Sequence, residues 1–217
     1  MLKQVHFGDF SSFDDFTLIL SAKKIETPKV KTETTDVPGA DGVLDFTEYF
    51  GEPKYENRKL SFDFSTMARY DGFLELFSQI QNALHGQRLN IWLDDDPDFY
   101  YVGRISVSEW QADKRIGKVT IECDCEPYKY KRYQTQITTE VSGSASVVYR
   151  NLRKSVTPQF DVSVNAGENM TVKYGTQTYS LSSGTFRMPE LVFYGGDTVL
   201  DYEGNGTVTV TYQEGGL

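Results

Sequence analysis

The strictest alternation of apolar and polar positions in the chain lies between residues 119 and 125. One set of alternate positions is apolar (Val119, Ile121, Cys123 and Cys125), and the positions between them are polar or charged. A period of two is typical of a β-strand with one face on a core and the other toward water. Pro127 lacks a backbone donor and has a fixed φ, so we expect the strand to end there or to reach a sheet edge.

A helical spacing occurs once, over residues 71–85. Apolar residues three and four positions apart form a stripe along one side of a helix, and here they are Phe73, Leu74, Phe77, Ile80 and Leu84. Asp71 suits the N-cap, and Gly86 suits the left-handed position after the last turn. A single helix among strands should pack over a sheet face or at one end of a sandwich.

The other segments before residue 136 predict strands joined by short turns. Leu60, Phe62 and Phe64 alternate with polar residues, and the glycines and aspartate of residues 38–42 predict a turn. We therefore expect a hairpin over about residues 30–64. Strands with one inserted helix indicate a mainly β (α+β) fold, with a β-sandwich-like domain over residues 1–136.

The composition changes near residue 136. Both tryptophans precede this point, and 10 of the 18 glycines follow it. Short strands separated by glycine-containing turns, such as residues 203–206, are typical of a small antiparallel sandwich. We therefore predict a second domain, a β-sandwich, over residues 137–217.

Charge and hydrophobicity exclude several classes of protein. The net charge of −9 argues against a protein that grips nucleic acid, because such proteins normally carry a basic patch. No apolar run approaches the ~20 residues that span a bilayer, so we expect no membrane association. The amino terminus also lacks the pattern of a secretory signal.

The candidates for metal binding and catalysis are few. Cys123 and Cys125 lie too close together for a normal disulfide and have no further zinc ligands nearby, so we expect buried thiols made in a reducing cytoplasm. The acidic loop 94–98 suits calcium by charge but lacks the spacing of a calcium loop, which favours a solvated turn. His6 and His85 are the only histidines, and no nucleophile elbow or phosphate loop occurs. We predict no enzyme activity and no cofactor.

Four short motifs together resemble a known family. They are Phe7-Gly8 with Asp14, residues 37–45 before Tyr55-Glu-Asn-Arg58, the exit Glu126-Pro-Tyr-Lys-Tyr130, and residues 208–212 before Glu214-Gly215. In these motifs the chain resembles the distal tail (Dit) proteins of siphophages and prophages of Gram-positive bacteria. The resemblance implies a virion structural protein at the phage tail tip, assembled in the host cytoplasm.

The family resemblance also implies partners. It implies a homo-hexameric ring, formed by the amino-terminal domain, that joins the tail tube protein to the tail-tip, tail-associated, baseplate or receptor-binding proteins. DNA would pass through the ring without specific binding, and the carboxy-terminal domain would be galectin-like. Residues 1–137 hold 23 acids against 17 lysines and arginines, and an acidic lumen would let DNA slide.

A ring needs two different complementary patches on each subunit. We expect residues 22–64 to supply one, because an extended arm can add a strand to a neighbour's free edge. The ring-interface candidates are Val37, Leu44, Phe46, Tyr49 and Phe50. The predicted joint between the two domains consists of Pro127, Tyr128, Tyr130 and Tyr133.

Two other functions stay open. The second domain could belong to a carbohydrate-binding module, with Tyr174, Tyr179 and Tyr194 stacking on sugar rings. The chain could also be another tube or tip component of a phage tail, which would polymerise into stacked rings.

Overall fold

The computed structural model describes residues 3–49, 51–66, 72–112 and 116–217. Its contacts divide the chain into two compact units, Met1–Lys129 with Leu217 and Tyr130–Gly216. We describe each unit by itself. The boundary predicted near residue 136 falls inside the first long strand of the second unit, β11 (Thr135–Asn151).

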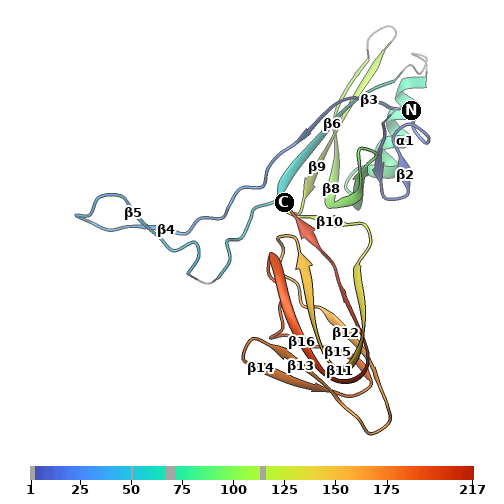
Figure 1. Ribbon diagram of the computed structural model, residues 1–217. Helices are drawn as coiled ribbons and strands as arrows, with labels where there is room; N and C mark the ends of the chain where they lie inside the picture. Colours follow the sequence, from blue (N-terminus) through green and yellow to red (C-terminus); the bar gives the residue numbers. More distant parts are fainter. Residues whose placement is uncertain (1–2, 50, 67–71, 113–115) are drawn as a thin grey trace. The chain divides into compact units, whose positions relative to one another are not determined.

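Strands dominate both units, and α1 (Phe73–Leu84) is the one α-helix among the described residues (Figure 1). The predicted mainly β, α+β fold class is confirmed. Within the same described ranges, no helix is long and apolar enough to cross a membrane.

The first unit is built on one antiparallel sheet. Its strands run in the order β2-β1-β7-β8-β9-β6-β3. Their bounds are β1 (Val5–Phe7), β2 (Phe10–Ser11), β3 (Ile19–Ile25), β6 (Arg58–Thr66), β7 (Arg88–Leu93), β8 (Asp96–Ala112) and β9 (Gly117–Cys125). Strand β8 continues through Gly103, which pairs with Leu89 on one side and Cys125 on the other.

Strand β9 lies between β6 and β8, and its apolar face is buried as the alternation predicts. Val119, Ile121 and both cysteines join the core, opposite the buried face of β6. Burial raises the pKa of the Cys125 thiol to about 12, which leaves it protonated at neutral pH. The prediction that both cysteines are small buried apolar residues is confirmed.

Helix α1 contributes Phe73, Ile80 and Leu84 to the buried residues, and the ring of Trp110 lies 5.4 Å from that of Phe77. Gly86 has φ +77°, so the predicted left-handed position is confirmed. The predicted N-cap, Asp71, lies outside the described residues. Leu74 was placed on the apolar stripe, but it is 68% exposed.

The second unit is organised by two long strands, β11 and β16 (Gly196–Tyr212), which pair along all 17 residues of each. One half of β16 also pairs with β12 (Gln159–Val164), which pairs with β15 (Gly184–Arg187). The other half pairs with β13 (Met170–Tyr174), which pairs with β14 (Gln177–Leu181). Two further short strands, β10 (Lys129–Lys131) and β17 (Gly215–Gly216), pair with each other.

Glycines allow β16 to pair with β11 and also with β12 and β13. Gly143 of β11 faces Gly204 of β16, and Gly143, Gly204 and Gly206 have φ values of +82°, +129° and +151°. A Cβ on Gly206 would lie 2.3 Å from the backbone oxygen of Ser163, so the close approach of β12 needs glycine there. The predicted turn at residues 203–206 is therefore wrong: these residues continue the strand through a bend.

Candidate assembly surface

The segment between β3 and β6 packs little against the rest of its unit. We call residues 26–57 the arm; it contains β4 (Thr34–Asp36) and β5 (Val43–Asp45). Figure 1 shows it as a narrow ribbon that leaves the sheet after β3 and returns at β6. The single hairpin predicted over residues 30–64 is therefore wrong in extent, because β6 pairs with β3 and β9 in the sheet.

Backbone bonds hold the arm together as a two-stranded ladder. Near the sheet, the amide of Lys31 donates to Lys54 (2.8 Å) and the amide of Glu56 donates to Lys29 (2.8 Å). Farther out, β4 pairs with β5, so that Thr35 lies opposite Leu44. The turn at the end has Gly39 and Gly42 at φ +86° and +76°, which confirms the turn predicted there.

The apolar side chains of the arm are exposed. Among the described residues of the arm, only Pro28 is buried. The ring-interface candidates are exposed by 39% (Val37), 52% (Leu44), 40% (Phe46) and 73% (Tyr49), and Val43 by 55%. Phe50, the fifth candidate, lies outside the described residues. A two-stranded ribbon without a covered face is only marginally stable in water, so the arm gains little stability from its own chain.

Charge divides the arm into two parts. We call residues 32–52 the tip: it carries Glu33, Asp36, Asp41, Asp45, Glu48 and Glu52 and no lysine or arginine. The remaining residues of the arm form the base, where Lys29, Lys31 and Lys54 outnumber Glu26 and Glu56. The whole arm has 8 acids against 3 lysines, a net charge of −5, and so holds most of the net −6 of residues 1–137.

The predicted joint residues differ in their surroundings. Tyr128 is half-buried and its ring lies edge-on to Tyr55 at 5.9 Å. Tyr130 is buried and its hydroxyl accepts a bond from Lys154 (2.7 Å), whereas Tyr133 is 78% exposed. The division between the two units falls directly before Tyr130. The role of these residues and of the half-buried Pro127 as a joint stays a prediction.

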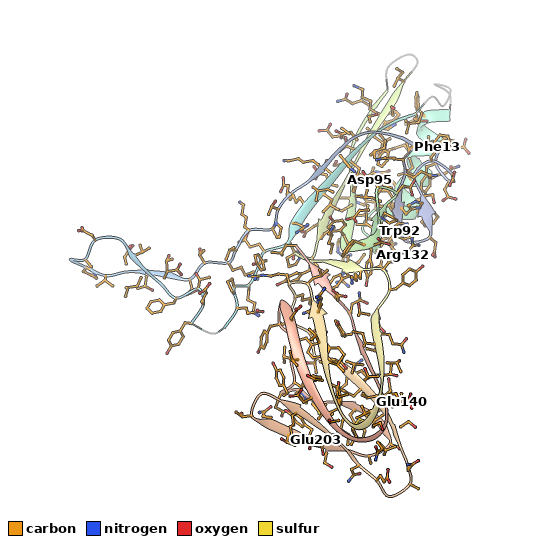
Figure 2. All side chains as sticks on the ribbon, in the orientation of Figure 1. Phe13, Trp92, Asp95, Arg132, Glu140 and Glu203 are labelled. Carbon is orange, nitrogen blue, oxygen red and sulfur yellow. The ribbon has the colours of Figure 1, made fainter. Side chains whose placement is uncertain are left out.

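Three carboxylates of the acidic loop contact a histidine or lysines. Asp94 lies 2.8 Å from Nε2 of His6, and Asp96 lies 2.7 Å from Nζ of Lys129. Asp95, labelled in Figure 2, pairs with Lys23, and this bond lowers the pKa of its carboxyl group. Across the described part of the chain, no group of three or more acidic, histidine or cysteine side chains could hold a metal ion.

The two histidines have structural contacts. The ring of His6 stacks on Trp92 with centroids 4.9 Å apart, and its Nδ1 lies 3.0 Å from the hydroxyl of Ser11. Nδ1 of His85 accepts the amide proton of Val107 at 3.1 Å. Both rings therefore help to hold strands of the first unit in place.

Several residues of the family motifs have packing roles that sequence reasoning did not identify. Arg58 is only 5% exposed, and its guanidinium lies 5.6 Å from the ring centre of Tyr101. Glu214 is 3% exposed and accepts bonds from Lys131 and Thr135. The carbonyl of Gly215 accepts two amide protons, from Arg153 and Lys154, each at 2.9 Å. The contacts of Glu214 and Gly215 tie these two residues to the rest of the second unit.

The second unit has a polar surface pocket and a separate set of tyrosines. The pocket, of about 340 Å³, lies on β11, β13 and β16 and is lined by Ser144, Ser146, Lys173, Asp201 and Glu203, among others. Two of the tyrosines proposed to stack on sugars are held by hydrogen bonds: Tyr174 donates to the carbonyl of Val192 (2.9 Å) and Tyr179 to Gln177 (2.5 Å). Tyr194 is 50% exposed.

No protein-family model and no curated protein matches the sequence. The structure, in contrast, is similar to the crystal structure of Dit (gp 19.1) of SPP1, described as a paradigm of the hub adsorption apparatus in phages that infect Gram-positive bacteria. The similarity covers 98% of this chain and 99% of that chain, with a TM-score of 0.69 and 16% sequence identity.

The chain has the Dit fold. The resemblance inferred from the four short motifs is confirmed at this level. Because the Dit fold covers both units, neither unit is an addition foreign to it.

Proposed function

We propose that this protein is a structural component of a phage virion, a distal tail hub that performs no reaction. The observation that carries the proposal is the similarity to SPP1 Dit over nearly the whole of both chains. A match of this extent includes the arm-bearing unit and the carboxy-terminal unit together. A protein with this role would be assembled in the bacterial host and would reside at the tail tip.

We further propose that six copies form a ring between the tail tube and the tail-tip or baseplate proteins, and that DNA leaves through its centre. The exposed arm supports this proposal, because a ring requires a patch on each copy that matches a different patch on the next. The arm exposes Leu44, Phe46 and Tyr49 without a covering layer of its own chain. Docking on a neighbour would bury these side chains.

Electron microscopy of the purified protein tests the ring. Closed rings of six copies with a central hole are the expected result, and long stacks of rings would indicate a tube protein. The matched variant lacks residues 30–58, and we expect it to lose the ring mass in light scattering. An unchanged mass after the deletion would contradict the role of the arm.

Carbohydrate binding by residues 137–217 is the second candidate function. The polar pocket favours it, because serine hydroxyls, a lysine and two carboxylates on one sheet surface can hydrogen-bond the hydroxyl groups of a sugar. A galectin-like role for this unit is part of the same proposal. Glycan-array binding by the full chain, lost in Asp201→Ala but kept in Asp197→Ala outside the pocket, would support it. Absence of any glycan signal would refute it.

A further inference from the structure

The base of the arm contains a charge arrangement that the isolated chain leaves uncompensated. Val30 forms a bridge with Tyr55 in the antiparallel ladder, which sets Lys31 opposite Lys54. Like charges directly opposite each other on paired strands are destabilising. Lys29 lies opposite Glu56 in the same ladder, whereas among the described residues neither Lys31 nor Lys54 forms an ion pair. An anionic surface placed over the base would relieve this repulsion.

The tip has the opposite imbalance. Its six carboxylates lie on a segment without a single lysine or arginine, and none of them forms an ion pair with another described residue. Asp45 alone has a local partner, since Thr47 donates to its carboxylate and lowers its pKa. A cationic surface placed against the tip would therefore gain attraction without having to break existing pairs.

The tip and the base also both expose apolar side chains. The tip exposes Leu44 and Phe46 by 52% and 40%, and the base and the adjoining end of β3 expose Val30 and Ile25 by 44% and 39%. Figure 2 shows the side chains of the arm projecting on both sides of its ribbon. Tip and base thus complement each other both in charge and in apolar surface.

We propose that the acidic tip of one copy docks on the lysine-bearing base of a second copy of this chain. This inference rests on the proposed ring and names the surfaces that would join its subunits. A short ribbon holds both patches, so the tip reaches a different molecule, and contact is head-to-tail. Repeated head-to-tail contacts close into a ring when the rotation between copies permits.

Charge reversal on each side tests the pairing. The base variant carries Lys29→Glu, Lys31→Glu and Lys54→Glu; the tip variant carries Glu33→Lys, Asp36→Lys and Glu48→Lys. All six positions are exposed, so we expect both variants to fold. By sedimentation velocity, each variant alone should associate about a hundredfold more weakly than the wild type. The introduced glutamates of the base variant then face the acidic tip, and the tip variant loses the net negative charge of its tip and places three lysines against the lysines of the base.

Mixing provides the decisive measurement. In an equimolar mixture, the unchanged acidic tip of the base variant meets the unchanged lysines of the tip variant, and the three lysines introduced into the tip meet the three glutamates introduced into the base. The mass of the wild-type assembly should therefore return. A control with Lys59→Glu, Lys118→Glu and Arg187→Glu changes the charge by the same amount at exposed positions outside the arm. It should keep the wild-type mass.

The outcomes separate this inference from the proposed function. If deletion of residues 30–58 dissociates the assembly but the reversed variants associate normally, or their mixture stays dissociated, the tip-to-base contact is refuted and the ring stands. If the wild-type chain is monomeric at every concentration, or the deletion changes nothing, the proposed ring itself is contradicted.

Discussion

Two antiparallel strand pairs in this protein differ in how much of their surface the rest of the chain covers. Strands β11 and β16 pair over 17 residues and bury Tyr149, Leu200 and Tyr202 in the core of their unit. Strands β4 and β5 pair over three residues and are exposed throughout. Hairpins gain stability from the apolar face that they bury, not from the ladder alone. The comparison shows that the long pair is covered within its own unit, whereas the arm buries almost none of its apolar surface against its own chain.

The largest expected difference in stability comes from a phenylalanine-to-alanine substitution made once in the core and once in the arm. Phe62 of β6 is fully buried, so Phe62→Ala should lower the free energy of unfolding by about 3–5 kcal/mol through the cavity that it leaves. Phe46 of the arm is 40% exposed, so Phe46→Ala should change this free energy by less than about 0.5 kcal/mol. Urea titration followed by fluorescence measures both. Equal losses would show that the arm is part of the folded core.

The next largest effect on stability is expected at Gly103, where β8 and β9 approach each other closely. A Cβ at Gly103 would lie 2.4 Å from the sulfur of Cys125 and 2.9 Å from the backbone oxygen of Asp124. Gly103→Ala should therefore cost up to about 3 kcal/mol in thermal or urea unfolding. Gly72 has nothing within 4 Å of its Cβ position, and Gly72→Ala should leave stability nearly unchanged. A tolerated Gly103→Ala would mean that β8 and β9 can separate.

Buried and exposed carboxylates give a third comparison. Glu214 is 3% exposed, and Glu214→Gln should cost about 2 kcal/mol because Lys131 and Thr135 lose a charged acceptor. Glu203 pairs with Lys173 at the surface, where its side chain is 54% exposed, and Glu203→Gln should cost well under about 1 kcal/mol. The unfolding transition of the second unit reports both values. Similar costs would contradict the structural role assigned to Glu214.

The smallest effect is a dependence on pH. The Lys23 bond lowers the pKa of Asp95 in the folded state, so the unfolded chain takes up its proton first as the pH falls. The contribution of Asp95 to stability is therefore present above its ordinary pKa of about 4 and is lost as the pH falls through the lowered value. Asp95→Asn should flatten the stability profile in that acidic range and match the wild type below it. An unchanged profile would exclude the pair as a contributor.

Residue patterns alone determined much of the first unit. The alternation in β9 and β6, the buried thiols, the helix and its terminal Gly86 follow from local periodicity and conformational preference. Local patterns are informative there because each strand has one clearly apolar face. The motifs also indicated the Dit fold, although overall identity to SPP1 Dit is only 16%.

Other features depended on contacts between distant residues. Residues 203–206 have the composition of a turn, and only pairing with β11, β12 and β13 makes them part of a strand. Burial of Glu214 likewise depends on β10 and Thr135, which lie about eighty residues earlier in the chain. The sequence by itself determined which segments prefer strand, helix or turn, because these preferences are local. Only the tertiary structure decided which apolar residues are covered and that those of the arm are not, because burial depends on what packs against each face.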